Sequence, residues 1–560
     1  MRLPSVLRSL LWGLLLTGTL GLLLSCESGG TEAVPAADFT AAAESDSEAA
    51  PEPQTTIKEE HIMYSVWLSN GYEKYGKLAP APAACAESIS LAMAKNETES
   101  FQLLLRPDAG EPESTVSVAV DGCSDGLTAE LYRVRSVETK KGRFDPDPLA
   151  PYDGAAADVP ADETTAFFIR LRASADAASG DRELTVQLKN NAGSVIGSYP
   201  VSVHIRNFAL PAASACASGV GLSKSNIGEM HYTFKESKRD ELYRAYYDLL
   251  LDFRLCAYDL PYDILDERAD VYMSDPRVTA FRIPDAVDDS VIRAYYEKLS
   301  QNPVWLGKGY FYPLDEPTSV EMLDTLKQKV ERIRGLFPGA RICTPFFRDI
   351  DYDGNTDQID FMTGVTDQWC PKSYMYLDKN IYDAKKAAKY PSFENRMLAR
   401  KAEGDRVWWY VCWEPGNPYC NLFLDQAGLQ HRLLFWQQKY YGVDGFLYWS
   451  TNYWNDTLDP WEDMATVKSL SPDVFGDGSL LYNGKKVGLD TGCPSLRLAA
   501  VCDGIEDFDL LTLAEQYLGK ERVREIIASV TPSLIDYTTD AAEFDRVRRM
   551  LGDELEAAIG

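Results

Sequence analysis

The 560-residue sequence is poor in the residue patterns that build metal centres. Histidine is rare, and its four occurrences form no HxH or HExxH pattern: His61, His204, His231 and His431. The eleven cysteines show no CxxC spacing, and two of them, Cys370 and Cys412, stand in apolar runs typical of a buried core. Zinc sites usually combine such ligands at short spacings, so we expect neither zinc nor another cofactor.

Positive charge is also scarce. Lys and Arg number 56 against 85 Asp and Glu, which gives a formal net charge of -29. Nucleic-acid binding needs a basic face, so nucleic acid is excluded as a partner. Hydrophobic residues make up 45% and aromatic residues 11% of the chain, enough for large cores. Because one domain typically takes about 100–200 residues, we expect several.

Long apolar runs are missing after the first 26 residues, so no membrane-spanning helix of about 18 or more residues is expected there. Within residues 1–26, Arg2 and Arg8 precede the Leu-rich stretch Leu10–Leu24, the layout of a signal peptide. The end of this segment, "LLLSC", resembles the bacterial lipobox, in which the cysteine is lipidated. An ordinary signal peptide with a chance cysteine is the alternative.

The lipobox resemblance predicts a lipid anchor on Cys26 and a location in the bacterial cell envelope, periplasmic or surface-exposed. Residues 27–60 are rich in Ala, Pro, Ser and Glu and contain one aromatic residue. Such a segment buries too little apolar surface to fold, so we predict a flexible acidic linker between anchor and domain.

Residues 61–212 have the pattern of an all-β domain. Short runs of alternating polarity are separated by Gly, Asn and Asp turns, and 184–205 is typical of a β-hairpin. An antiparallel β-sandwich is the expected fold.

After residue 213 the spacing of the hydrophobic residues changes from strand-like alternation to a helical period. Amphipathic helical stretches at 236–253, 289–300 and 319–337 alternate with short apolar runs. The runs are 219–223, 257–263, 279–283, 305–316, 340–346, 365–376, 406–415 and 444–454. This alternation predicts a (β/α)8 TIM-type barrel over 213–470, followed by a C-terminal helical extension over 471–560.

Two adjacent carboxylates, Asp315 and Glu316, end one of these runs and precede Pro317. The same dipeptide occurs at four other places, in charged helical or polar contexts. Barrel enzymes build active sites at the carboxyl ends of their strands, so the pair is a candidate catalytic site. The alternative is a helix start with Asp315 as N-cap and Pro317 in the first turn.

Aromatic residues accompany the acidic pair. Seven of the eleven tryptophans lie between 408 and 461: Trp408, Trp409, Trp413, Trp436, Trp449, Trp454 and Trp461. An aromatic rim able to stack on sugar rings is one interpretation. Core packing is the other, and it is preferred for Trp436, which stands in a helical stretch.

Carboxylates beside aromatic walls suggest glycoside hydrolysis. Most glycosidases place two carboxylates on different strands, whereas two adjacent carboxylates point to the substrate-assisted exceptions. In these, the sugar's own 2-acetamido oxygen attacks the anomeric carbon. One carboxylate protonates the leaving oxygen, and the other stabilises the acetamido nitrogen as an oxazolinium ion forms.

The sequence resembles glycoside hydrolase family 123. The barrel motifs "YFYPLDEP", "WWYVCWEP" and "DGFLYWSTNYW" carry this resemblance, as does the segment 476–511. In the front domain, "AKNETESFQLLL" and "FDPDPLAPYDG" resemble the β-sandwich that precedes this barrel. The family implies a retaining exo-β-N-acetylgalactosaminidase that needs no metal and acts on glycans with terminal N-acetylhexosamine.

Transferred motif by motif, the resemblance assigns Asp315 to stabilisation of the acetamido group. Glu316 becomes the general acid and then the base that activates water. Strand-end positions additionally predict Tyr374, Tyr410, Trp449 and Asn452 as the lining of the substrate pocket. Two alternatives remain open: a glycan-binding lipoprotein without turnover, and a glycosidase for another sugar with a conventional two-carboxylate mechanism.

A second candidate site lies in "DIDYDGNTDQID". Asp349, Asp351, Asp353 and Asp360 occupy positions 1, 3, 5 and 12 of a calcium-loop pattern, with Gly354 at position 6. The segment lacks the preceding helix of an EF-hand and has Asp where Glu is usual. An acidic loop rich in Asx turns is the alternative.

Overall fold

The computed structural model describes residues 63–140 and 142–560. The predicted signal segment 1–26, its lipidation residue Cys26 and the predicted linker 27–60 lie outside these residues. Residues 61–560 form one compact unit, so the sandwich, the parallel strands and the C-terminal helices are described together. The segment boundaries expected at 212 and 470 stay predictions.

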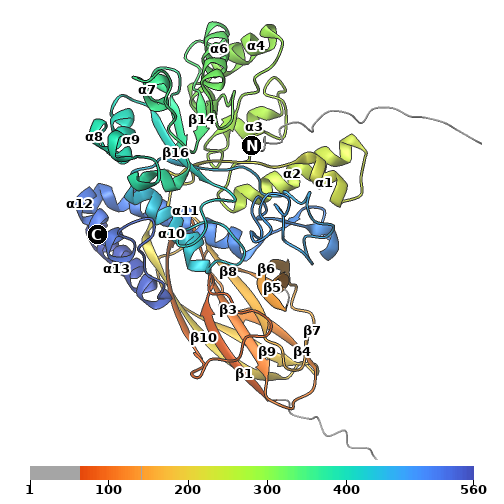
Figure 1. The fold of residues 1–560 in the computed structure, drawn as a ribbon. Coiled ribbons are helices and arrows are strands. Elements are labelled where there is room, and N and C mark those ends of the chain that lie inside the picture. Colours follow the sequence, from red (N-terminus) through yellow and green to blue (C-terminus); the bar gives the residue numbers. More distant parts are fainter. Residues whose placement is uncertain (1–62, 141) are drawn as a thin grey trace, which may run out of the picture. The chain divides into compact units, whose positions relative to one another are not determined.

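The N-terminal part of the described chain consists of β-strands (Figure 1). They are β1 (Tyr64–Asn70), β2 (Ile89–Lys95), β3 (Glu97–Pro107), β4 (Ser114–Asp121), β5 (Leu127–Lys140), β6 (Arg143–Pro151), β7 (Ala157–Val159), β8 (Thr165–Ala173), β9 (Gly180–Asn190) and β10 (Val195–Ala209). Within the described residues they form two five-stranded sheets, ordered β1-β3-β8-β5-β6 and β2-β10-β9-β4-β7.

Alternating side chains of both sheets meet in one core. Examples are Phe101 and Leu103 on β3 and Val201 and Val203 on β10, all of which are buried in the same cluster. This period-two pattern is what a half-buried strand requires. The hairpin predicted at 184–205 is confirmed, because β9 and β10 pair antiparallel.

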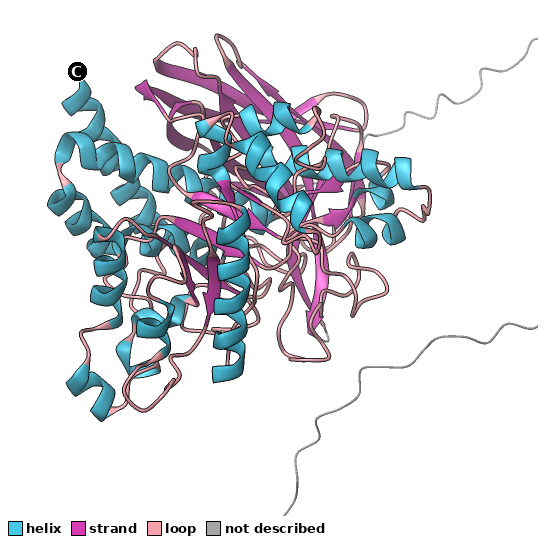
Figure 2. Cartoon of the chain, turned by 90° about the horizontal axis from the view of Figure 1, so that it is seen from above, coloured by secondary structure: helices cyan, strands magenta, loops and turns pink. Residues whose placement is uncertain are grey.

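The second part of the chain alternates short parallel strands with helices. The strands are β11 (Ala217–Val220), β12 (Phe281–Arg282), β13 (Gly309–Tyr310), β14 (Cys343–Phe346), β15 (Gln368–Pro371), β16 (Arg406–Val411) and β17 (Gly445–Tyr448). The helices are α1 (Lys224–Met230), α2 (Glu236–Asp252), α3 (Ala269–Ser274), α4 (Asp289–Leu299), α5 (Pro303–Lys308), α6 (Val320–Leu336), α7 (Gln358–Met362), α8 (Ala384–Lys389), α9 (Phe393–Ala402) and α10 (Gly428–Tyr440). Figure 2 shows helices flanking these strands.

The parallel strands form a five-stranded sheet in the order β11-β17-β16-β15-β14 and a pair, β12-β13. Two expected strands are shorter than the sequence indicated. The run 257–263 contributes only a bridge at Ala257, and 305–308 belongs to α5 because Asn302 caps a helix start with Pro303 in its first turn. The expectation of parallel strands with intervening helices is confirmed, and strand ladders as such do not establish a closed barrel.

Side chains on alternate positions of the parallel strands form an inner cluster. Its buried members are Tyr258, Ala280, Tyr310, Cys343, Cys370, Trp408, Tyr410, Cys412 and Leu447. On β16, Trp408 and Tyr410 belong to this cluster, whereas Trp409 and Val411 pack in the larger core with the helices. The interpretation of Cys370 and Cys412 as buried core residues is confirmed.

Space for Trp408 depends on a glycine in the neighbouring strand. A Cβ placed on Gly445 would collide with the Trp408 indole ring. Gly445→Ala is therefore expected to lower the free energy of unfolding by about 1–3 kcal/mol, measured by urea denaturation. Gly335→Ala on α6 is the control, because its Cβ has nothing within 4 Å, and it is expected to be neutral or mildly stabilising. Equal stability of Gly445→Ala and wild type contradicts this account.

The C-terminal region contains β18 (Tyr482–Asn483), β19 (Gly492–Cys493), α11 (Leu496–Leu518), α12 (Lys520–Val530) and α13 (Ala541–Ile559). Short 3₁₀ helices are η1 (Ser373–Tyr376), η2 (Asp378–Asn380) and η3 (Gly484–Val487). Helix α11 packs against α10, α13, β3 and β6, and it is buried almost around its whole circumference over its first four turns. In the described ranges, no helix is long and apolar enough to span a membrane.

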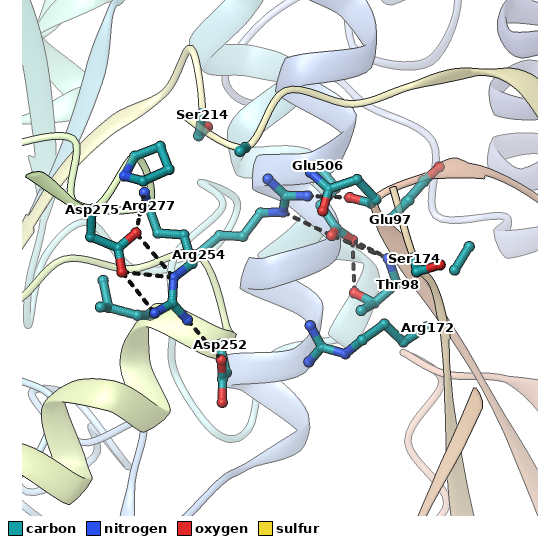
Figure 3. A pocket seen from close by; sticks show the side chains of 15 residues that line it. Glu97, Thr98, Arg172, Ser174, Ser214, Asp252, Arg254, Asp275, Arg277 and Glu506 are labelled. Atoms are coloured by element: carbon teal, nitrogen blue, oxygen red, sulfur yellow. Dashed lines mark hydrogen bonds and ion pairs between the residues drawn. The ribbon is translucent and has the colours of Figure 1, made fainter. Parts of the chain in front are cut away.

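The contact between α11 and the sandwich is charged. Glu506 on α11 accepts hydrogen bonds from the Thr98 hydroxyl and from Arg254 Nε, each at 2.8 Å. Figure 3 shows these residues beside Arg277, which pairs with Asp252 at 3.1 Å. These residues line a pocket between the sandwich and α11. The charged groups Glu506 and Arg254 at its centre already pair with each other, which indicates that they join the sandwich to α11 structurally.

Candidate active site

Asp315 and Glu316 lie in the loop that connects β13 to α6. The strand direction continues to Phe311, which bridges in parallel to Ile342. Helix α6 begins only at Val320, and its N-cap is Ser319, whose side chain accepts from Met322 N. The alternative in which Asp315 caps the helix is therefore wrong, because the loop extends beyond the carboxylates before the helix starts.

The backbone at Glu316 adopts an uncommon conformation. Its φ is 40°, in the left-handed region that side chains other than glycine rarely occupy. Such a residue costs about 1–3 kcal/mol and is typical of functional sites. In an extended chain, neighbouring side chains point to opposite faces. The left-handed residue interrupts that alternation, which allows adjacent carboxylates to serve one site.

Each carboxylate has its own tyrosine donor. The Tyr312 hydroxyl donates to Asp315 Oδ1 at 2.6 Å, and the Tyr410 hydroxyl donates to Glu316 Oε1. Burial first, and the Glu316 charge second, raise the pKa of Tyr410 well above its usual range. Burial likewise raises the pKa of Tyr312, with Tyr258 and Asp315 adding to it. Both phenols therefore stay protonated and keep the carboxylates oriented.

In addition to burial, the negative charges of both carboxylates raise the pKa of the same buried thiol, that of Cys370. The pKa of Cys370 is raised well above its usual range by burial, by the adjacent Cys343, and then by the charges of Asp315 and Glu316. Asp315 is exposed and Glu316 is half-buried, so the pair faces solvent on one side and the inner cluster on the other.

A buried cation completes the charge pattern. Lys372 follows β15, and its side chain is 3% exposed. Its Nζ lies 3.8 Å from Glu316 Oε1 and 3.7 Å from Glu414 Oε2. The Tyr410 ring centroid is 5.4 Å from the same Nζ. Lys372 thus links the catalytic candidate Glu316 to a second acidic residue.

The predicted pocket residues occupy different positions. Tyr410 contacts Glu316 directly. The Tyr374 ring centroid lies 5.9 Å from Lys372 Nζ. The Tyr374 hydroxyl donates to Phe347 O at 2.7 Å. Burial, followed by the Glu414 charge, raises the pKa of Tyr374 to about 12.

Trp449 follows β17 and packs against the inner cluster. Its indole Nε1 donates to Asp477 Oδ2 at 3.0 Å, and Tyr448 donates to Asp477 Oδ1 at 3.1 Å. Burial raises the pKa of Asp477 to about 7, although these hydrogen bonds oppose the shift. The buried Asp477 carboxylate therefore fixes the orientation of the Trp449 indole ring.

Asn452 is buried and fully engaged with backbone. Its Oδ1 accepts from Ser223 N at 2.8 Å and its Nδ2 donates to Ser223 O at 2.9 Å. Both polar atoms hold the start of α1, and no contact joins Asn452 to the carboxylates within the described residues. The structure thus gives Asn452 a bracing position instead of the predicted pocket lining.

The tryptophan-rich segment is mostly core. Fully buried members are Trp408, Trp409, Trp436 and Trp454, and Trp461 is 8% exposed. Core packing of Trp436 is confirmed. Trp413 is 39% exposed and Trp449 is partly buried, so only these two of the seven present open surface near the site. The interpretation of the whole segment as an aromatic rim is wrong, because strand alternation sends most of the rings into packed cores.

The calcium-loop candidate has a different arrangement. Asp349 Oδ2 pairs with Lys386 at 2.9 Å, and Asp360 pairs with Arg396 at 2.7 Å. Asp351 and Asp353 accept backbone N–H groups of their own turn. Among residues 63–140 and 142–560, no group of three or more His, Cys, Asp or Glu side chains is arranged to hold a metal ion. These contacts fit the Asx-turn interpretation and not the calcium pattern.

Sequence reasoning missed Tyr312, Lys372, Glu414 and Asp477. A signal was present for two of them. Glu414 ends the run 406–415 much as the acidic pair ends its own run, and Lys372 follows the apolar stretch "QWCP". A polar residue just after each strand was the common feature.

Carboxylates beside partly exposed aromatic rings, in loops after parallel strands, form an arrangement that is typical of carbohydrate-cleaving enzymes. Residues 298–514 match the family model described as glycoside hydrolase 123, catalytic domain. The resemblance drawn from the motifs is confirmed: the chain is a glycoside hydrolase and carries a family 123 catalytic domain.

Solved structures add the fold. A family 123 glycoside hydrolase from Clostridium perfringens, described in connection with glycolipid glycan hydrolysis, superimposes with a TM-score of 0.63 at 11% identity. The match covers 89% of this chain and 98% of that chain. A putative beta-galactosidase from Bacteroides fragilis gives a TM-score of 0.23 at 9% identity, over 64% of this chain and 53% of that one. No curated protein matches the sequence.

Proposed function

We propose that the protein is a retaining exo-glycosidase that removes terminal β-linked N-acetylhexosamine, most favourably GalNAc, from glycans. One observation carries the proposal. Two adjacent carboxylates stand in the loop after β13, each with a separate tyrosine donor, and a left-handed residue lies between strand and helix. A pair on one strand end suits an enzyme whose substrate supplies the nucleophile.

The chemistry then follows from the two positions. The acetamido oxygen attacks the anomeric carbon while Glu316 gives its proton to the leaving oxygen, so the glycosidic bond breaks and an oxazolinium ion forms. Asp315 accepts a hydrogen bond from the acetamido N–H and stabilises the positive charge that develops there. Glu316, now a carboxylate, removes a proton from water, which attacks the anomeric carbon. Two inversions restore the original configuration.

The scaffold of this site is a (β/α)8 barrel in our proposal. Support comes from backbone bonds that connect the two parallel sheets. Val220 N donates to Cys256 O at 2.9 Å, Arg282 N to Tyr258 O at 2.8 Å, and Phe311 N to Arg341 O at 2.8 Å. With the strand ladders, these bonds lead from each parallel segment to the next and back to β11. Asp315, Glu316, Lys372 and Glu414 then all stand after carboxyl ends of strands.

The choice of an N-acetylated sugar rests on the family and on the adjacency of the carboxylates. The C. perfringens relative is described as acting on glycolipid glycans, which supports a glycan as the substrate of this chain. The proposal for GalNAc over GlcNAc comes from the family resemblance alone.

The test uses the purified fragment from residue 61 onward, which corresponds to the compact unit. We expect release of chromophore from aryl β-GalNAc, slower release from aryl β-GlcNAc, and competitive inhibition by the matching N-acetylhexosamine thiazoline, a mimic of the oxazoline. Turnover of another sugar without thiazoline inhibition indicates a conventional two-carboxylate glycosidase. Binding of the sugars with no turnover indicates a glycan-binding protein, and both outcomes contradict the proposal.

A further inference from the structure

The Lys372 ammonium is a cation held in an aromatic environment. Its Nζ lies 4.7 Å from the ring centroid of Phe347 and 5.9 Å from that of Trp413, in addition to the rings of Tyr374 and Tyr410. Aromatic faces attract a cation electrostatically and stabilise it where water is scarce. The rings therefore hold the charge in position without using its N–H donors.

Those donors have no protein acceptor in the described part of the chain. An ammonium group carries three N–H donors. The nearest carboxylate oxygens, at 3.8 and 3.7 Å, are too far for good hydrogen bonds. The Nζ atom itself is not fully enclosed, so oxygen atoms of water or of a ligand can reach it and accept from these donors.

The contacts of Lys372 indicate which part of a glycan it faces. In the proposed mechanism Glu316 serves the glycosidic oxygen, the atom that joins the cleaved sugar to its leaving group. Lys372 Nζ lies 3.8 Å from Glu316 Oε1 and 3.7 Å from Glu414 Oε2. These distances favour a position of Lys372 and Glu414 beside the departing sugar.

Glu414 also borders an open cleft. A cleft of ≈ 420 Å³ is lined by Tyr374, Asn380, Glu414, Pro415, Gly416, Asn417 and Tyr419. Trp413, the residue before Glu414, is exposed and has its ring centroid 5.9 Å from Lys372 Nζ, and the Glu414 side chain is 46% exposed. An aromatic surface next to an ammonium and a carboxylate presents an apolar face, donors and an acceptor together, as binding of a hydroxylated ring requires.

We propose that Lys372, Glu414 and Trp413 form a subsite for the leaving-group sugar, in which Lys372 donates to one ring hydroxyl and Glu414 accepts from a neighbouring one. The inference rests on the proposed function. It makes the enzyme selective for a glycan in which the cleaved bond leads to a second hydroxylated sugar, over an aglycone without hydroxyls.

The experiment compares two substrate types on the same enzyme. One is an aryl β-GalNAc glycoside, whose aglycone lacks hydroxyls, and the other is a set of β-GalNAc-galactose disaccharides with 1,3 and 1,4 linkages. For Glu414→Gln, the ratio of kcat/KM for the best disaccharide to kcat/KM for the aryl glycoside is expected to fall by about tenfold or more, because a hydrogen bond to a charged group is lost. Trp413→Leu is expected to lower the same ratio, and its exposed position makes misfolding an unsuitable explanation.

Glu331→Gln is the matched control, since Glu331 is exposed on α6 and its ratio should equal that of wild type. Unchanged ratios for Glu414→Gln and Trp413→Leu, with normal turnover of the aryl glycoside, overturn the subsite alone. Failure of wild type to cleave either substrate type overturns the proposed function together with the subsite. Lys372→Met adds a second readout, because it is expected to lower activity on both substrates through Glu316 but to lower it more on the disaccharide.

Discussion

Glu316→Gln is expected to lower kcat/KM by about 10²–10⁴-fold on a β-GalNAc substrate with a poor leaving group, because general acid–base catalysis contributes about this much. Glutamine keeps the shape of the side chain and can still contact the Tyr410 hydroxyl, but it cannot give a proton to the departing oxygen. Steady-state kinetics on the residue 61–560 fragment measure the effect.

Leaving-group dependence separates the roles of the two carboxylates. A substrate with a highly activated aryl leaving group needs little protonation, so the loss in Glu316→Gln should shrink strongly on it. Asp315→Asn should lose activity on both substrates, because stabilisation of the acetamido group is needed whatever departs. Equal leaving-group dependence in both variants would falsify the division of labour between Asp315 and Glu316.

The control for this series is Glu331→Gln on α6, a surface change that should leave kcat/KM unchanged for both substrates. Melting curves for all three variants check the fold. Glutamine has the same shape and, like glutamate, a Cβ, so the left-handed strain at position 316 stays, and we expect Glu316→Gln to change stability little while activity falls. Loss of activity accompanied by a large loss of stability contradicts a catalytic role.

Asp507→Asn is expected to lower the free energy of unfolding by about 3–5 kcal/mol, the range for breaking a buried ion pair by removing one partner. Asp507 is fully buried on α11. It accepts from Arg432 Nε at 2.7 Å, Arg548 Nε at 2.6 Å and Trp436 Nε1 at 2.9 Å. An arginine cannot release its proton in a protein, so both guanidinium groups stay charged when Asp507 loses its carboxylate.

The effect should depend on pH. Burial would raise the pKa of Asp507, but Arg432 and Arg548 outweigh it and hold the pKa below its usual value. The neighbouring Glu97 pairs with Arg548, and burial raises its pKa to about 7. At pH 8 Glu97 is ionised and compensates part of the missing charge, whereas near pH 5 it is largely neutral. The stability loss in Asp507→Asn is therefore expected to be larger at pH 5 than at pH 8.

Glu462→Gln is the matched control, since Glu462 pairs with Lys486 at 2.9 Å but its side chain is 75% exposed. Exposed ion pairs contribute only about 0–1 kcal/mol, so this variant should unfold close to wild type at both pH values. Chemical denaturation at pH 5 and pH 8 measures both variants. A loss below 1 kcal/mol for Asp507→Asn, or one that grows toward pH 8, contradicts the account of this buried network.

Local pattern was sufficient for much of the fold. Period-two alternation with turn residues predicted the strands of the sandwich, including the β9–β10 hairpin. Helical periodicity predicted α2, α4 and α6 to within a residue or two of their ends. The pattern erred where a capping residue took effect, because Asn302 starts α5 inside an expected strand. At α6 the N-cap Ser319 agrees with the helical stretch expected from 319 and rules out only the alternative in which Asp315 caps the helix.

The buried charge network was hidden from the sequence. Glu97 and Glu99 on β3, and the acidic residues of α11, have the composition of exposed surface, yet they are buried against Arg432 and Arg548. Their partners lie more than 300 positions away in the chain. No local rule pairs residues across such a separation, because the pairing exists only after the sandwich, α10, α11 and α13 have packed.

The sequence by itself determined the class of the protein and the position of the acidic pair, because both depend on short motifs and on the order of strand, carboxylates and helix. The tertiary structure alone decided which rings are available to a sugar, since strand direction and side-chain alternation bury Trp408 and Trp409 on opposite sides of β16 and leave Trp413 exposed. It also brought Lys372 between Glu316 and Glu414, residues from three separate strand ends. Such a constellation depends on the parallel strands lying side by side, a contact that no single segment encodes.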